Sequence, residues 1–256
     1  MFKCKYFLLI FLIFISSCSK EDSNNGLDGI DKSGNLQPTG SSSNDILSDV
    51  NYTSLLVELV YVEGFEPTQT AVNDFISFLE ERTFKPGGIT VEARSIPSPG
   101  LSPYSIQEIA DIETVNRTKY NTDDQITIWA FFADGEANGN SDTELTLGTA
   151  YRNTSFVIYV ASIEDITGGT FQPSQSVLES TVIQHEFGHI LGLTNLGAAL
   201  QSDHEDPENP KHCDVETCLM YFAAETGAGA MNMVSGGTIP QLDTQCLADL
   251  QANGGK

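Results

Sequence analysis

The sequence has little positive charge: 12 lysine and arginine residues stand against 35 aspartate and glutamate residues, for a net charge of −23. Such a polyanion repels phosphate backbones, which argues against nucleic acid as a partner. The chain also lacks an apolar run long enough to span a bilayer, and it contains no evident internal repeat. Its 256 residues, 40% of them hydrophobic, can still bury the core of one or two domains, and we expect a monomer.

The first 17 residues are typical of a signal peptide. Lys3 and Lys5 precede an apolar run from Phe7 to Ile15, which is too short for a membrane helix but fits a signal core. The stretch ISSC, ending at Cys18, resembles the lipobox of bacterial lipoproteins. That resemblance implies cleavage after residue 17 and a lipid on Cys18 that anchors the chain to the outer membrane of a bacterial envelope. The alternative is an ordinary cleaved signal with an incidental cysteine.

The segment behind this cysteine is polar. Its first residues, SKED, are similar to the surface-export tails of lipoproteins in Bacteroidetes-like bacteria. Residues 19 to about 50 are rich in serine, asparagine, glycine and aspartate, so they cannot bury enough surface to offset their ordering entropy. We therefore expect a flexible stalk or short pro-segment over residues 18–50, and one folded domain over residues 51–256.

The hydrophobic pattern of that domain predicts an α/β (α+β) fold. Strands are expected at 54–62, 88–96, 125–133, 144–152 and 155–163, and helices at 67–81, 104–116 and 176–192. Ser176 and Glu179 have the spacing of a capping box at the start of the third helix. Regular patterns fade after Gly192 until a last helix at 240–252. The order predicts a mixed twisted sheet with backing helices, followed by an irregular lower part.

The third helix carries the stretch QHEFGHILGLTN, residues 184–195. His185 and His189 are four residues apart and share one helix face, so both imidazoles can bind one metal ion. Glu186 lies beside them, where a carboxylate can accept a proton from a water that zinc has acidified to a pKa of about 7. The alternative is two helix histidines near a buried acid, without metal. Only four histidines occur in the chain, and two of them fall in this register.

Residues 185–192 resemble the HExxHxxG motif of the metzincin clan of zinc peptidases, in which the chain turns beneath the metal after the glycine. Asn195 stands where such motifs place the third ligand; it is a poor zinc ligand, and we expect it to order the turn. Residues 212–220, HCDVETCLM, are similar to the H-C-x4-C-x-M segment of the archaemetzincins. This resemblance implies that His212 is the third ligand and Met220 the Met-turn, after an insertion at 195–211.

Other residues are alternatives to His212 as the third ligand. His204 lies in the insertion and is the rival third ligand. A thermolysin-like glutamate would have to be Glu205 or Glu208, but Pro207 and Pro210 argue against the helix that such a ligand needs. The archaemetzincin family's second cysteine pair, C-x-x-C, is absent from this chain, so a second, structural zinc is not expected.

The remaining cysteines lie in the exported part of the chain. Because that compartment is oxidising, Cys213 and Cys218 are expected to form a disulfide, whereas Cys246 has no obvious partner. The alternative is that Cys213 or Cys218 binds metal.

An acidic loop at 133–144 is a candidate calcium site. It alternates oxygen-bearing side chains, but its spacing misses the EF-hand pattern because the twelfth position is Leu145. A solvated acidic loop is the alternative. The oxygen-bearing side chains are Asp134, Glu136, Asn138, Asn140, Asp142 and Glu144.

These features predict a zinc-dependent endopeptidase that hydrolyses peptide bonds with Glu186 as general base. Residues 147–151 are similar to the metzincin edge strand, which pairs with an extended peptide or protein substrate. The alternative function is a non-catalytic surface lipoprotein that keeps zinc as a structural pin. A closed four-ligand site, with both His204 and His212 on the metal, would mark that alternative.

Overall fold

The computed structural model describes residues 30–141, 145–170 and 172–256. The expected signal peptide, the lipobox and Cys18 lie outside the described residues. Residues 31–256 belong to one unit. Within the described ranges, no helix combines the length and the apolar character needed to cross a membrane.

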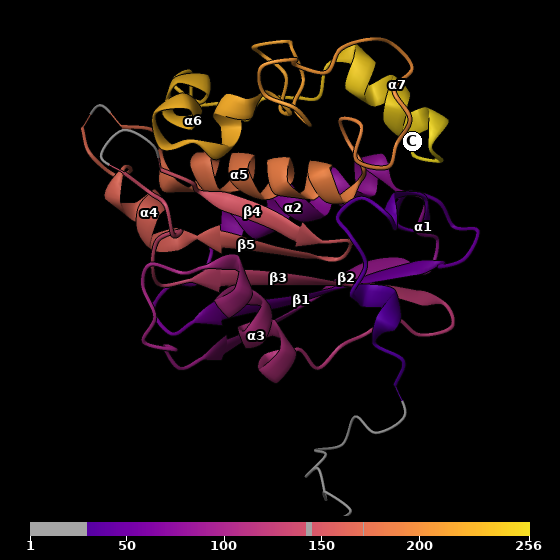
Figure 1. The fold of residues 1–256 in the computed structure, drawn as a ribbon, viewed down its shortest axis with the longest axis horizontal. Helices are drawn as coiled ribbons and strands as arrows, with labels where there is room; N and C mark the ends of the chain where they lie inside the picture. The colour runs from indigo at the N-terminus through magenta and orange to yellow at the C-terminus, as the bar shows by residue number, and fades with distance from the viewer. Residues whose placement is uncertain (1–29, 142–144, 171) are drawn as a thin grey trace, which may run out of the picture. The chain divides into compact units, whose positions relative to one another are not determined.

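Five strands form one mixed sheet in the order β2-β1-β3-β5-β4 (Figure 1). Strands β2, β1, β3 and β5 are parallel neighbours, whereas β4 runs antiparallel to β5 and forms an edge. The two central strands, β1 and β3, are almost continuously buried, as expected for parallel strands covered on both faces. The strand bounds are β1 Ser54–Val62, β2 Gly88–Ile96, β3 Gln125–Ala133, β4 Gly148–Arg152 and β5 Ser155–Tyr159.

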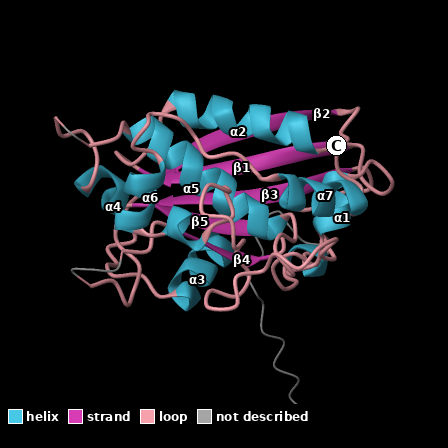
Figure 2. Cartoon of the chain, turned by 90° about the horizontal axis from the view of Figure 1, so that it is seen from above, coloured by secondary structure: helices cyan, strands magenta, loops and turns pink. Residues whose placement is uncertain are grey.

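Helices cover both faces of this sheet, and each face has its own core (Figures 1 and 2). On one face the Phe75 ring of α2 packs edge-on against Phe187 of α5, with centroids 5.0 Å apart. On the other face Ile109 of α3 packs in a cluster with Trp129. The helix bounds are α1 Ser43–Leu47, α2 Gln69–Arg82, α3 Ile106–Asn116, α4 Val160–Asp165, α5 Gln175–Ile190, α6 Gly227–Met233 and α7 Thr244–Ala252, with short 3-10 helices η1 Ser33–Asn35 and η2 Phe222–Glu225. The predicted α/β fold with a mixed sheet, backing helices and a less regular C-terminal part is confirmed.

Two local predictions were wrong. The fifth predicted strand ends at Tyr159, and its second half is helix α4. The third helix is capped by Ser174, whose side chain accepts a hydrogen bond from Val177 N, and not by Ser176. The carboxylate of Glu179 accepts hydrogen bonds from the backbone and side chain of Thr68 at 2.9 and 2.7 Å, so it joins α5 to the start of α2 and does not complete a capping box.

The expected stalk reaches too far into the chain, because residues 31–50 pack onto the domain. Ile46 and Leu47 are fully buried in the main core. The buried Asn35 side chain donates to the carbonyl of Thr127 in β3 at 3.1 Å. The Lys85 ammonium donates to the carbonyls of Asp45, Ser48 and Tyr52. The polar composition of this segment was therefore misleading, because its polar groups form hydrogen bonds with the folded domain.

Candidate metal centre

Helix α5 presents two imidazoles to one point, as its i, i+4 spacing predicts. His185 and His189 are buried, and their Nε2 atoms lie 3.2 Å apart. His212 arrives from the loop beyond the helix, with its ring centroid 5.4 Å from that of His185 and 5.0 Å from that of His189. The three side chains form one group with Glu225, in which all ligand atoms lie within 4.8 Å of one another.

The imidazole nitrogens in this group fit a metal. The Nδ1 atom of His185 lies 2.7 Å from the carbonyl oxygen of Leu219, which leaves its Nε2 facing the centre. Both ring nitrogens of His212 are buried without a hydrogen-bond partner among the described residues. Buried polar atoms are nearly always paired, and a bound ion would satisfy Nε2 of His212, the nitrogen that lies near Glu225. Burial lowers the pKa of His185 and of His189, which keeps both rings in the neutral form that metals bind.

The chain turns beneath the helix as the motif predicts. Gly192 has a φ of 83°, a left-handed conformation that favours glycine. The amide of the next residue, Leu193, donates a hydrogen bond to the carbonyl of Gly188. Asn195 also has a positive φ, 63°, and its side chain donates to Glu205 at 2.9 Å, which places it in the turn. Met220 packs directly under Gly188, where a β-carbon would lie 2.2 Å from its sulfur.

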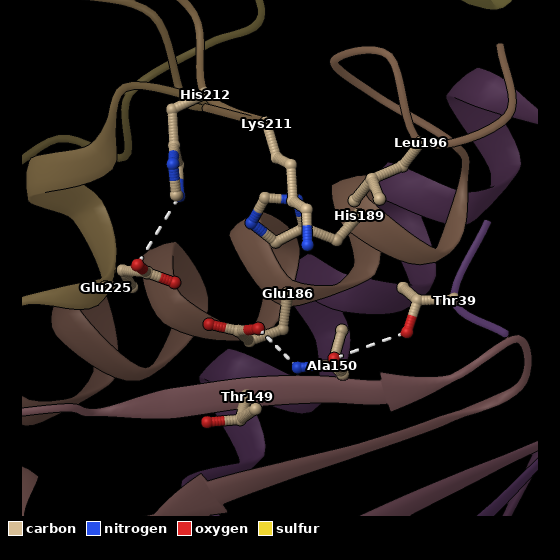
Figure 3. Close-up of a pocket in the computed structure, with 9 residues that line it drawn as sticks. All are labelled: Thr39, Thr149, Ala150, Glu186, His189, Leu196, Lys211, His212 and Glu225. Carbon is tan, nitrogen blue, oxygen red and sulfur yellow. Dashed lines mark hydrogen bonds and ion pairs between the residues drawn. The ribbon is translucent and has the colours of Figure 1, made fainter. Parts of the chain in front are cut away.

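Glu186 is positioned by the edge strand. Its Oε2 accepts a hydrogen bond from the backbone amide of Ala150 at 2.7 Å, whereas its Oε1 has no partner among the described residues. Burial raises the pKa of this carboxyl well above its usual range, and the nearby charge of Glu225 adds to the effect. Figure 3 shows Glu186 between β4 and the histidines, in a cavity of about 170 Å³ that Thr39 and Thr149 also line.

Glu225, at the end of η2, was not predicted from the sequence. Its carboxylate oxygens lie 3.4 Å from Nε2 of His212 and 3.8 Å from Nε2 of His185. Burial favours the neutral acid, but the contact with His212 and the attraction of the neighbouring imidazoles in their protonated form outweigh this effect and lower the pKa of Glu225 to about 2. No motif marks it; only its position shortly after the Met-turn could have suggested it.

A second group of potential ligands contains Cys213, Cys218, Asp243 and Cys246. The Sγ atoms of Cys218 and Cys246 are 3.7 Å apart, and the sulfur of Cys213 lies 3.7 Å from a carboxylate oxygen of Asp243. Sulfurs bound to a tetrahedral zinc at about 2.3 Å are about 3.8 Å from one another, so this spacing fits zinc. Hydrogen bonds from the neighbouring thiols lower the pKa of Cys218 to about 3, which favours a thiolate.

The predicted disulfide between Cys213 and Cys218 was wrong. Both are free thiols in the structure, and Cys246, expected to be unpaired, joins them. The reason is spatial: α7 brings Cys246 back to the loop from far along the chain, so three sulfurs surround one point and no two of them are bonded.

His204 lies at this second group and not at the histidine centre. Its Nδ1 is 3.5 Å from the sulfur of Cys213, and its Nε2 is 2.9 Å from the carboxylate of Asp249. A carboxylate behind a histidine orients the opposite nitrogen toward a metal. His204 therefore faces the cysteines, and together with Asp243 it is a candidate fourth ligand there.

The loop at 133–144 is not among the groups of potential metal ligands found in the described residues. Asp134 accepts hydrogen bonds from Tyr104 and Ser98, and the side chain of Asn140 accepts one from the amide of Thr146. These oxygens serve the loop's own structure, and calcium gains no support. Asp142 and Glu144 lie outside the described residues.

This chain resembles solved structures of metalloproteases, including the following two. An archaemetzincin from Methanopyrus kandleri matches with a TM-score of 0.50 and 17% identity, over 79% of this chain and 95% of that protein. Metalloproteinase-II from Bacteroides fragilis matches with a TM-score of 0.41 and 14% identity, over 90% of this chain and 59% of that protein. The sequence matches no protein-family profile and no curated protein. The fold, a five-stranded mixed sheet with backing helices, is thus similar to that of archaemetzincin.

Proposed function

We propose that this chain is a zinc-dependent endopeptidase in which His185, His189 and His212 hold the metal and Glu186 is the general base. The observation that carries the proposal is Glu186 itself. A structural metal site does not need a buried carboxylate with one oxygen anchored and the other free. The archaemetzincin-like fold supports the same conclusion. When bound, zinc would acidify a water and polarise the scissile carbonyl.

The protein's own residues position Glu186 to accept a proton and later to release it. The amide of Ala150 fixes Oε2 of Glu186 and leaves Oε1 to accept a proton from the attacking water. Burial stabilises the neutral form of the carboxyl, so the proton is retained until it passes to the leaving amine. The carbonyl of Leu219 holds His185 in the orientation that points Nε2 at the centre.

A peptide substrate would lie along β4. This strand is one edge of the sheet, and its residues Thr149 and Ala150 line the cavity next to Glu186. Both backbone groups of Ala150 are already engaged, the amide by Glu186 and the carbonyl by the hydroxyl of Thr39 at 3.4 Å. Pairing with an added strand would therefore use backbone groups on either side of Ala150.

The cysteine group is proposed as a structural zinc site. Its ligands come from the loop after His212 and from α7, so a metal there would join two parts of the chain that share little regular structure. Four protein ligands from Cys213, Cys218, Cys246 and either His204 or Asp243 leave no open position, as in structural sites.

The test of the activity compares wild type with Glu186→Gln on a library of peptides, with Glu216→Gln as a matched control from an exposed position. Loss of the base should lower cleavage by ~10²- to 10⁴-fold at unchanged zinc content. Equal cleavage by Glu186→Gln and wild type would refute the mechanism. Zinc binding without any cleavage by wild type would favour the non-catalytic alternative.

The location is a separate proposal that rests on the sequence of the first residues. We propose that Cys18 carries a lipid that anchors the mature chain to the outer membrane of a bacterial envelope. Cys18→Ser should release the protein from membrane pellets, and mass spectrometry of the wild type should show the lipid. A wild-type chain without lipid mass would overturn this assignment.

A further inference from the structure

The side chain of Glu225 faces the imidazole atoms that would bind the metal. Its Oε1 is 3.4 Å from Nε2 of His212, and its Oε2 is 3.8 Å from Nε2 of His185. Figure 3 shows it reaching toward His212 from the ribbon of η2, beside Glu186. Glu225 is neither a metal ligand nor the general base in the proposed mechanism.

The contact of Glu225 with His212 suits a shared metal better than a hydrogen bond. Ligands at about 2.0–2.1 Å from a tetrahedral zinc are about 3.3–3.4 Å from one another. A charge-assisted hydrogen bond between nitrogen and carboxylate is about 2.7–2.9 Å. The Nε2 atoms of His185 and His189 are 3.2 Å apart, and the contact of Glu225 with His212 is 3.4 Å, so both have the length of a tetrahedral edge.

The tautomer of His185 leads to the same conclusion. Its Nδ1 is engaged by the carbonyl of Leu219, so its Nε2 is the atom available to a metal. A metal-bound nitrogen has no proton to donate. With an ion present, these imidazole nitrogens could no longer donate to the carboxylate of Glu225, and a bond from that carboxylate to the ion would replace them.

The two carboxylates of the centre are held differently. Glu186 is tied to the edge strand through Ala150 and does not belong to the group of potential ligands. Glu225 is held by its backbone: its carbonyl accepts the amide of Leu147 at 2.9 Å, and the next residue forms a bridge with Thr146. This attachment keeps the carboxylate over the imidazoles and leaves Glu186 free to act as base.

We propose that Glu225 is a fourth protein ligand of the metal held by the three histidines. In the resting protein a carboxylate then takes the position that a catalytic site gives to water, and a substrate or water must displace it before hydrolysis. The inference rests on the proposed function for its consequence in catalysis, but the ligand assignment itself stands on metal binding alone.

The experiment measures zinc affinity at the histidine centre by chelator competition. Cobalt substitution separates the two sites, because only the cysteine group gives sulfur-to-metal charge-transfer absorption. Glu225→Gln preserves the shape of the side chain but removes the ligand, and should raise the zinc Kd by at least about 100-fold, more than loss of an outer-shell partner. Glu216→Gln, which removes an exposed charge from the same loop region, should change the Kd by less than about threefold.

Chemical rescue distinguishes a ligand from a nearby charge. In Glu225→Ala, acetate should restore most of the lost zinc affinity, whereas chloride at the same ionic strength should not. A Kd for Glu225→Gln within about tenfold of wild type would overturn the proposal, as would an Ala variant indifferent to acetate. If the proposed peptidase function fails instead, wild type will cleave nothing while the affinity loss and its rescue remain.

Discussion

Gly188 sits in α5 between the two metal-facing histidines, where a helix-forming residue would be expected. Glycine costs about 1 kcal/mol relative to alanine in a helix interior, so its presence here needs a reason. Met220 supplies one: a β-carbon at position 188 would lie 2.2 Å from its Sδ and 3.1 Å from its Cε. The sulfur of Met220 therefore occupies the space that a side chain at position 188 would need.

Gly188→Ala should consequently destabilise the protein. Ordinary contacts between such atoms begin at about 3.5 Å, so the sulfur would have to move by more than about 1 Å. Overpacking of this kind typically costs ~1–3 kcal/mol, from which the gain of about 1 kcal/mol in helix propensity is subtracted. The displaced turn also carries Leu219, whose carbonyl orients His185, so zinc affinity should fall with stability.

A double-mutant cycle with Met220→Ala measures this packing. In that background the clash is removed, and Gly188→Ala should become stabilising by up to about 1 kcal/mol. The assay is urea denaturation of the zinc-loaded protein, with zinc content determined for each variant. If Gly188→Ala has the same effect in both backgrounds, Met220 is not the residue that position 188 accommodates, and the account of the Met-turn is refuted.

Three further predictions concern other parts of the molecule. Cys246→Ser should lower the zinc content by about one ion per chain, as measured by atomic spectroscopy; an unchanged content would exclude the cysteine site. The zinc-free protein should lose stability as the pH falls below about 6.5, because burial lowers the pKa of His185 and His189 and the unfolded chain then takes up protons that the folded chain excludes. The measurement is made in Glu186→Gln, because the raised pKa of Glu186 stabilises the folded wild type at low pH and would mask the effect of the histidines. A free energy of unfolding, measured by urea denaturation, that does not change from pH 8 to pH 5 would contradict this prediction. Lys85→Met should destabilise by about 2–3 kcal/mol, because three carbonyls lose a charged donor; no change would mean that these ammonium hydrogen bonds contribute nothing to stability.

Local signals in the sequence predicted the upper part of the fold well. The buried strands β1 and β3 have nearly uninterrupted apolar residues, whereas the edge strand β2 alternates, and the ranges of all three follow from those patterns. The spacing of His185 and His189 is equally local, since helix geometry alone places i and i+4 on one face. Gly192 also acts through its own backbone, as a left-handed residue that ends the helix.

The features that sequence reasoning missed depend on contacts between distant segments. Cys246 meets Cys218 only because α7 packs back under the loop, so no spacing rule could pair them. The disulfide was predicted from two cysteines close in sequence, and the third sulfur changed the chemistry of the group. Glu225 was missed for the same reason, because its neighbours His185 and His212 come from elements that only the tertiary structure brings together.

The loop from His212 to Met220 connects the two candidate metal sites. Two adjacent residues belong to different sites: His212 is part of the histidine centre, while Cys213 is part of the cysteine group. The far end repeats the arrangement, since Cys218 belongs to the cysteine group and the next residue, Leu219, provides the carbonyl that orients His185. A metal bound by the cysteines would therefore fix both ends of the segment that presents the third histidine. Because this loop has little regular secondary structure to hold it, occupation of the cysteine site should be coupled to zinc affinity at the histidine centre, through the conformation of these nine residues and without direct contact between the ions.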